Sequence, residues 1–301
     1  MSRTRALLEA DLLSWMREAA WRPDDARFAG LALEVFAFQF EHCEPYRRFC
    51  TRRGATPDRV EDWRAIPPVP TGAFKEVPLR CFPAEHTVRT FRTSGTSGST
   101  RGEIHLDSLS LYEASLLPTL RRHLLPDLEP GRRALLLALA PPPEEAPDSS
   151  LTHMFATAIA AFGAPGSAFF VSDGALREKE LRSALAAAGE APLLVAGAAF
   201  AFVHLLDALE RAGAKLSLPA SARIMETGGF KGRTRSLPRE ELHAALADRL
   251  GVPTDRIMNQ YGMTELGSQF YDSTLAEPGS SRRKLGPPWV RVRIVDPESD
   301  R

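Results

Sequence analysis

Hydrophobic residues recur at helix-like intervals in the first fifty positions of the chain. This spacing predicts two amphipathic helices, one over residues 5–20 and one over residues 27–48. The passage IPPVPTGAFKEVPL, residues 66–79, is expected to be extended or turn, because each proline restricts the residue before it. The positions that set the helical interval are Leu7, Leu8, Leu12, Leu13, Phe28, Leu31, Val35, Phe36 and Phe40.

From residue 86 onward, short apolar runs alternate with amphipathic stretches. Strands are predicted over residues 87–92, 103–106, 134–140, 167–171, 192–196, 222–227, 256–262 and 289–296. Helices are predicted over residues 109–124, 150–163, 176–189, 200–213 and 239–251. This alternation predicts an α/β fold with βαβ layers and a mostly parallel sheet. We therefore expect an N-terminal helical and proline-rich segment, residues 1–85, packed on an α/β core, residues 86–301.

Composition narrows the class of protein. Lys and Arg number 38, as do Asp and Glu, so the formal net charge is zero, which argues against a nucleic-acid binder. Charged residues interrupt the apolar start of the chain, and no apolar stretch reaches membrane-spanning length. The three cysteines, Cys43, Cys50 and Cys81, form no C-x-x-C pair, so a disulfide framework or zinc site is not expected. We expect a reduced, cytoplasmic protein.

The stretch FRTSGTSGSTRGEIHL, residues 91–106, places hydroxyls and glycines between two predicted strands. Glycines let a backbone approach a ligand closely, and consecutive N–H groups form an anion nest. Hydroxyls add donors, and Arg92 or Arg101 would add charge. The stretch is not a Walker A loop. Its composition fits either a phosphate cradle or a mobile surface connection.

Two further polar loops follow predicted strands. METGGFKGR, residues 225–233, contains a Gly-Gly pair against which a flat ligand can lie; a tight turn is the alternative. NQYGMTELGSQFY, residues 259–271, offers Tyr261 for stacking, Thr264 for a phosphate and Glu265 for magnesium. A strand end followed by a helix cap explains the same residues without a ligand. The carboxyl ends of parallel strands meet at one edge of a sheet, so the three loops are expected to share one crevice.

In order and character, the three loops resemble the signature of the adenylate-forming superfamily of acyl-CoA synthetases and adenylation domains. The resemblance implies the large N-terminal domain of such an enzyme, with a site for ATP and Mg²⁺. It implies that Tyr261 stacks on adenine, that Thr264 contacts the α-phosphate and that Glu265 binds the metal. It assigns nucleotide contacts to Thr93, Ser94, Gly95, Thr96, Ser97, Gly98, Gly228, Gly229, Phe230 and Gly262.

Pro70, the pair Phe74-Lys75, TGGFKGR and YGMTELGSQFY together resemble the acyl-protein synthetase family, over about residues 66–296. This family includes the fatty-acid-activating subunit of the bacterial bioluminescence reductase complex. The resemblance implies activation of a carboxylic acid, here a fatty acid, as acyl-AMP, followed by transfer to a cysteine thiol. An acyl reductase or an acyl carrier protein is the implied partner. His153, in SLTHMF, lies where related ligases keep a histidine or aromatic near the acyl pocket; packing on a helix face is the alternative.

The sequence ends in DPESDR, where superfamily members continue. We therefore expect this chain to lack the C-terminal lid domain, with its ribose-binding aspartate, catalytic lysine and acyl-accepting cysteine. None of the three cysteines matches that acceptor. Two alternatives stay open: a phenylacetate-type ligase that passes the acyl group to coenzyme A, and a catalytically silent nucleotide-binding module that partners a reductase or carrier.

Overall fold

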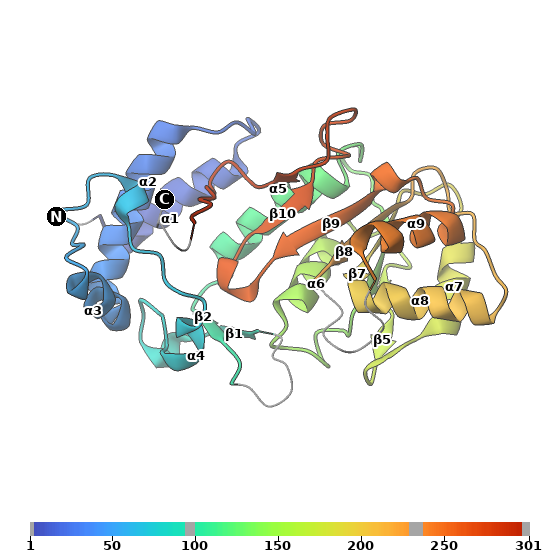
Figure 1. The fold of residues 1–301 in the computed structure, drawn as a ribbon, viewed down its shortest axis with the longest axis horizontal. Coiled ribbons are helices and arrows are strands. Elements are labelled where there is room, and N and C mark those ends of the chain that lie inside the picture. Colours follow the sequence, from blue (N-terminus) through green and yellow to red (C-terminus); the bar gives the residue numbers. More distant parts are fainter. Residues whose placement is uncertain (1–2, 94–99, 229–236, 297–301) are drawn as a thin grey trace.

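The structure is a computed structural model that describes residues 3–93, 100–228 and 237–296. Its centre is a seven-stranded sheet in the order β11-β10-β9-β8-β7-β3-β4 (Figure 1). Strands β4, β3, β7, β8 and β9 are parallel, whereas β10 and β11 run antiparallel at one edge. The predicted α/β fold with a mostly parallel sheet is thus confirmed. The strands are β3 (Leu135–Leu139), β4 (Ala168–Phe169), β7 (Leu193–Ala198), β8 (Arg223–Thr227), β9 (Ile257–Gly262), β10 (Gln269–Asp272) and β11 (Lys284–Leu285).

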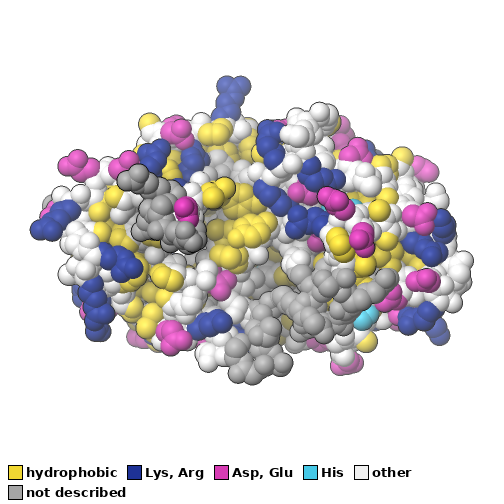
Figure 2. Space-filling view, viewed as in Figure 1, with side chains coloured by type: hydrophobic (Ala, Val, Ile, Leu, Met, Phe, Trp, Pro, Cys, Tyr) yellow, Lys and Arg dark blue, Asp and Glu magenta, His cyan; other side chains and the backbone are white. Residues whose placement is uncertain are grey.

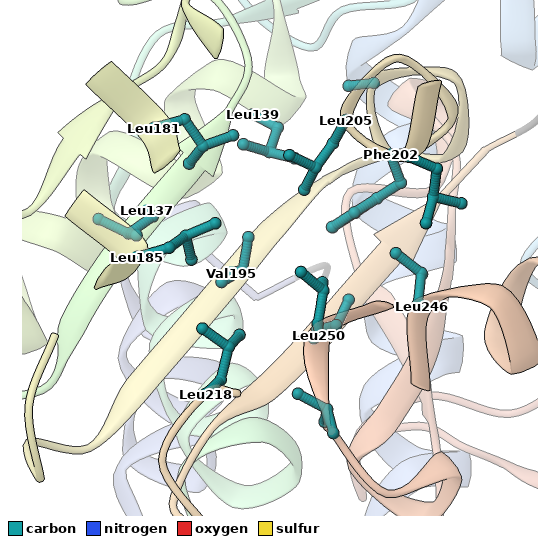
Figure 3. Close-up of a cluster of buried hydrophobic side chains, with 14 of the residues drawn as sticks. Leu137, Leu139, Leu181, Leu185, Val195, Phe202, Leu205, Leu218, Leu246 and Leu250 are labelled. Atoms are coloured by element: carbon teal, nitrogen blue, oxygen red, sulfur yellow. The ribbon is translucent and has the colours of Figure 1, made fainter. Parts of the chain in front are cut away.

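Helices cover both faces of this sheet because its central strands are apolar on both sides. One face packs against α5 (Ser110–Leu124) and α6 (Ser150–Phe162). The other packs against α7 (Glu178–Ala186), α8 (Ala199–Arg211) and α9 (Arg239–Leu250), and Figure 3 shows leucines from both layers meeting there. Side chains alternate along each strand, so Leu137 and Leu139 face α7–α9 while Leu136 and Ala138 face α5 and α6.

The N-terminal part is helical and lies at one end of the molecule, beyond α5 (Figure 1). It contains α1 (Arg5–Arg17), α2 (Asp25–His42) and α3 (Glu44–Arg52). The single helix predicted over residues 27–48 is therefore two helices. The break falls at Cys43, whose backbone is extended, and α3 restarts with Pro45 in its first turn, where proline is well tolerated.

Shorter elements connect these layers. The proline-rich passage contains one helical turn, α4 (Ala73–Glu76), and β1 (Arg89–Arg92) pairs antiparallel with β2 (Glu103–Leu106). β5 (Val171–Ser172) pairs with β6 (Ala175–Leu176). The 3-10 turns are η1 (Trp63–Ala65), η2 (Ala84–His86), η3 (Thr254–Arg256) and η4 (Thr264–Leu266). No helix in the described ranges combines the length and apolar character needed to cross a bilayer.

The strand predicted over residues 289–296 is wrong. No strand forms there, although the Val-Arg alternation has the period of one. The segment lies against α2, where Arg291 binds Asp25 at 2.6 Å and sits 4.7 Å over the ring of Phe28. Val292 and Ile294 are 65% and 94% exposed. Alternation predicts a strand only where a neighbouring strand offers hydrogen bonds, and none of the described strands lies beside this segment.

Candidate active-site cleft

A cleft of about 630 Å³ opens at the carboxyl ends of the parallel strands. Ala140, Ala198, Thr227 and Gly262 line it from the ends of β3, β7, β8 and β9. Helices α5 and α6 supply one wall, through Tyr112, Leu151 and Met154 among others. The described parts of the three polar loops also line this cleft, at the sheet edge where the sequence places them.

The two ends of the Ser/Thr/Gly loop, Thr93 and Gly102, are hydrogen-bonded to each other; we call this pair the root of the loop. Thr93 donates its N–H to the carbonyl of Gly102 at 2.9 Å, and its hydroxyl accepts the N–H of Gly102 at 2.9 Å. Asp148 clamps both ends: its carbonyl accepts the N–H of Arg92 at 2.8 Å and its carboxylate binds Arg101 at 2.8 Å. The predicted phosphate contacts Ser94, Gly95, Thr96, Ser97 and Gly98 lie outside the described residues.

Both arginines of this loop are engaged within the protein. Arg92 binds Glu103 at 2.7 Å, and Arg101 donates to the carbonyl of Thr93 at 2.6 Å as well as to Asp148. Their charges therefore hold the two ends of the loop together. Both also line the cleft.

The second loop begins at Gly228, which lines the cleft with a positive φ of 70°, a conformation that favours glycine. The residue before it, Thr227, donates its hydroxyl to the carbonyl of Gln260 at 3.0 Å, which joins the ends of β8 and β9. Gly229 and Phe230, predicted to line adenine, lie outside the described residues.

Thr264 and Glu265 of the third loop both line the cleft. The hydroxyl of Thr264 lies 3.2 Å from that of Ser150, at the start of α6. The Glu265 carboxylate faces the root of the first loop: a Cβ on Gly102 would lie 3.5 Å from Glu265 Oε1. Close approach at Gly102 thus brings the root of the Ser/Thr/Gly loop beside the predicted metal ligand.

Glu265 forms no ion pair with another described residue, and the described residues contain no cluster of three metal-binding side chains. A half-buried carboxylate without a cation suits Mg²⁺, which is commonly held by one or two carboxylates together with phosphate oxygens and water. The donor set therefore fits a magnesium ion that arrives with a nucleotide.

Tyr261 and Gly262 occupy the end of β9. Tyr261 does not line the cleft; its side chain is 51% exposed, and its ring packs 6.2 Å from the ring of Phe270. Gly262 lines the cleft, and a Cβ there would lie 2.5 Å from Gln260 Nε2. A larger residue there would require the Gln260 amide to move.

His153 does not line the cleft, whereas its neighbour Met154 does. Its Nε2 lies 3.1 Å from Glu113 Oε1, and its ring packs 5.3 Å from Phe91 and 5.7 Å from Tyr112. Burial lowers the pKa of His153, while the Glu113 carboxylate opposes that shift. These contacts place His153 behind the cleft wall, where it supports Tyr112.

Sequence reasoning did not single out Asp148, Ser150, Gln260 or Gln269, all of which line the cleft. Asp148 and Ser150 follow β3 and the proline cluster, so the rule that ligands lie at strand ends would have pointed to them. Gln260 and Gln269 lie inside the third motif, flanking the residues that carried the resemblance.

Comparison with known proteins agrees with this architecture. The chain is similar to a solved 2-hydroxyisobutyryl-CoA ligase in an open conformation with acyl-AMP and CoA, at TM-score 0.54 and 13% identity, over 83% of this chain and 57% of that one. A postadenylation state of that ligase gives TM-score 0.52 and 16% identity, over 84% and 52%. The chain thus spans little more than half of these ligases, and they share its fold.

Curated relatives are similar over most of the chain. The long-chain-fatty-acid–luciferin-component ligase of Vibrio harveyi is 24% identical over 274 residues, covering 88% of this chain and 68% of the relative. Its counterpart from Aliivibrio fischeri is 23% identical over 282 residues, covering 89% and 69%. The family model "Acyl-protein synthetase, LuxE" matches residues 6–301. With an adenylate-forming fold and this match over nearly its whole length, the chain belongs to the LuxE acyl-protein synthetase family.

Proposed function

We propose that this cleft binds Mg²⁺-ATP and a carboxylic acid, and joins them as an acyl-adenylate. The observation that carries the proposal is convergence: Thr93 and Arg101 of the first loop, the turn at Gly228 and the pair Thr264–Glu265 line one cleft. These residues come from three separate loops that lie between residue 93 and residue 265 of the sequence. A nucleotide with its metal requires donors for its phosphates, glycine backbone that a flat base can approach, and a carboxylate for the metal, all in one cleft.

The chemistry follows from the poor leaving group of a carboxylate. One carboxylate oxygen attacks the α-phosphorus of ATP, a new oxygen–phosphorus bond forms, and the bond to the bridging oxygen breaks. Pyrophosphate departs with the electron pair, and the acid now carries AMP as its leaving group. Because charge accumulates on the phosphoryl oxygens, the protein contributes mainly by positioning and by aimed donors.

We assign these contributions to named residues. Thr264, oriented by Ser150, donates its hydroxyl to the α-phosphate. The first loop, held by Asp148 at its root, supplies N–H and hydroxyl donors to the β- and γ-phosphates. Glu265 holds the magnesium ion, which when bound offsets phosphate charge. Tyr261 offers its exposed face to adenine.

The acid lies on the α5 and α6 side of the cleft. Tyr112, Leu151, Met154 and Ala198 form an apolar wall there, suited to an acyl chain. The relatives named as long-chain-fatty-acid ligases support a fatty acid as the substrate class.

Transfer to a protein cysteine is the proposed second step. A thiolate attacks the acyl carbonyl carbon, the thioester forms, and AMP leaves. Cys43, Cys50 and Cys81 lie in or against the N-terminal cluster and do not line the cleft. The acceptor thiol therefore reaches the cleft from elsewhere, which suits an acyl reductase or acyl carrier partner.

Trapping with hydroxylamine tests the proposal. Purified protein given Mg²⁺-ATP, hydroxylamine and a fatty acid should form the acyl hydroxamate, and Glu265→Gln should lose it. Adding coenzyme A in place of hydroxylamine distinguishes the acceptor: accumulation of acyl-CoA would identify a coenzyme A ligase. ATP binding with no hydroxamate from any acid would identify a silent nucleotide-binding module.

A further inference from the structure

A second groove, of about 660 Å³, lies outside the cleft, between α3 and the proline-rich passage that contains α4. Its apolar lining comes from both sides, with Phe49 on α3 and with Val69, Val77 and Leu79 on the passage. Val77 is 37% exposed. Single apolar side chains are ordinary on a protein surface, but several that line one groove indicate a surface that a partner covers.

The rim of this groove is basic. Residues 44–54, EPYRRFCTRRG, contain four arginines and one glutamate, in a chain whose formal net charge is zero. Arg48, Arg52 and Arg53 line the groove, and none of them forms an ion pair with a carboxylate in the described part of the chain. Glu44, the one carboxylate among the described lining residues, is already bound by an arginine of the same helix. Figure 2 shows Lys and Arg side chains beside hydrophobic ones at the end of the molecule where Figure 1 places α3 and α4.

The packing of α3 turns its charged side chains outward. Tyr46 and Cys50, four residues apart, are buried in the N-terminal hydrophobic cluster, and the four arginines around them are exposed. The Arg53 guanidinium lies 4.2 Å over the ring of Phe49, so positive charge borders the apolar lining directly. Arginines close together repel one another, and carboxylates supplied from outside relieve that repulsion. The groove is therefore complementary to an acidic ligand with an apolar face.

The groove and the active-site cleft meet at the root of the Ser/Thr/Gly loop. Ala73 lines the groove, and the next residue, Phe74, packs against the root: a Cβ on Gly102 would lie 3.4 Å from Phe74 Cβ. The same Cβ would lie 3.5 Å from the Oε1 atom of Glu265, which lines the cleft. A protein bound in the groove therefore lies beside the cleft, with only α4 and the loop root between them.

We propose that this groove docks an acidic amphipathic helix of the partner protein that accepts the acyl group. The apolar face of the helix packs on Phe49, Val77 and Leu79, and Asp or Glu side chains beside that face pair with Arg48 and Arg52. The inference rests on the proposed function and deepens it, because docking here brings the partner's thiol beside the cleft that forms the acyl-adenylate. The ion pairs at the rim steer association and select the partner, and the apolar contacts hold it.

Two synthetic helical peptides, labelled with a fluorophore, test the inference. Both have leucines spaced as i, i+3, i+4 and i+7 and a cysteine after a Gly/Ser linker; one carries glutamates beside the leucines, and the other carries lysines at the same positions. Fluorescence anisotropy gives the affinity of each peptide for the protein. We expect the glutamate peptide to bind at least about tenfold more tightly at low salt, and this ratio to fall as salt rises.

Charge reversal on the protein separates docking in the groove from general attraction. Arg48→Glu/Arg52→Glu should invert the preference, so that the lysine peptide binds more tightly. The matched control, Arg22→Glu/Arg132→Glu, reverses two exposed charges outside the groove and should keep the preference for the glutamate peptide. Val77→Asn should weaken binding of the glutamate peptide by about fivefold without changing its salt dependence, because it removes an apolar contact.

Equal affinity for the two peptides overturns the inference, as does a preference that the control pair loses as fully as Arg48→Glu/Arg52→Glu. Tighter binding to vesicles of anionic phospholipid than to the glutamate peptide, lost in Arg48→Glu/Arg52→Glu, also overturns it and makes the groove a lipid-binding surface.

Acyl transfer separates failure of the inference from failure of the proposed function. With Mg²⁺-ATP and a fatty acid, the cysteine of the glutamate peptide should be acylated faster than that of the lysine peptide. Equal acylation rates overturn the inference, while hydroxamate formed with hydroxylamine leaves the proposed function standing. No hydroxamate from any acid would remove the proposed function, and the acceptor role of the groove with it, even if the glutamate peptide binds.

Discussion

The Thr264 hydroxyl lies 3.2 Å from the Ser150 hydroxyl, 114 residues earlier in the chain. Ser150 begins α6, which lines the proposed acid side of the cleft, and Thr264 begins the turn that carries Glu265. One of the two hydroxyls must donate to the other, so Ser150 restricts where the Thr264 proton points. This hydrogen bond links Thr264, the proposed phosphate contact, to the cleft wall formed by α5 and α6.

Ser150→Ala should therefore lower the pyrophosphate-exchange rate by roughly two- to tenfold, the value of one net hydrogen bond. The KM for ATP should change less than kcat, because the substitution affects orientation. Thr264→Val, which removes the proposed donor itself, should cost more. Ser183→Ala, on the exposed side of α7, is the matched control and should match the unaltered protein. Equal rates for Ser150→Ala and the control would refute the positioning role.

Glu265→Gln tests the proposed metal ligand. The substitution keeps the shape of the side chain and removes its charge, so acyl-adenylate formation should fall by about 10²–10³, the scale of losing one charge-stabilising group. The Mg²⁺ concentration needed for half-maximal activity should rise. Glu76→Gln, exposed on α4, controls for loss of a surface carboxylate. An unchanged Mg²⁺ titration curve would exclude Glu265 as the ligand.

Tyr261→Ala tests the stacking role. Removing the exposed ring should weaken Mg²⁺-ATP binding by about 1–3 kcal/mol, as measured for base stacking on aromatic side chains. Tyr261→Phe keeps the ring and should bind nearly as well as the unaltered protein. Isothermal titration calorimetry gives both values. Comparable affinity for the alanine and phenylalanine variants would place adenine elsewhere.

Most of the α/β core was predictable because local patterns and tertiary contacts agree there. Runs such as residues 134–140 and 222–227 are buried on both faces, so their apolar character alone identifies them as strands. Where tertiary contacts decide whether a strand forms, the hydrophobic pattern led to the wrong prediction. Residues 289–296 alternate like a strand yet have no strand beside them, and β10 forms only because Gln269–Asp272 pair with β9.

The site was predictable only as far as its motifs extend. Thr264 and Glu265 were identified by resemblance, and the structure places both in the cleft. The clamp at Asp148 was not predictable, because its partner Arg101 is 47 residues away in sequence and only the fold brings them together. Gln269 lies inside the third motif, but its place in the cleft follows from the pairing of β10 with β9, which the sequence pattern does not predict.

Gly197 is predicted to be essential for the contact between β3 and β7. A Cβ there would lie 2.6 Å from Leu139 Cβ and 2.9 Å from the Leu139 carbonyl, which is backbone and cannot yield. Gly197→Ala should destabilise the protein by about 1–3 kcal/mol through overpacking. Gly30→Ala, in the middle of α2 with no atom within 4 Å of the new Cβ, should instead stabilise it by about 0.5–1 kcal/mol. Urea unfolding measures the free energy of unfolding of both variants. If Gly197→Ala and Gly30→Ala destabilise the protein equally, the steric explanation is wrong.

His123 predicts how stability depends on pH. It is 1% exposed, its ring stacks 5.6 Å from Tyr271, and neither ring nitrogen has a partner among the described residues. Burial lowers the pKa of His123 to about 4, and the charge of Arg122 adds to this shift. The folded protein thus keeps the imidazole neutral across a range where the unfolded chain protonates it.

Between pH 6.5 and about 4, the unfolded state binds a proton that the folded state does not, so the free energy of unfolding must fall as pH falls. The loss attributable to this group is roughly 3 kcal/mol over the whole range and is absent above pH 6.5. His123→Phe keeps an aromatic ring against Tyr271 and removes the titrating group, so its unfolding free energy should depend less on pH in this window. Urea unfolding at pH 7.5, 6 and 5 measures the difference, with the exposed His86→Gln as control. If the His123→Phe curve runs parallel to that of the unaltered protein, the histidine is not the group that couples stability to pH.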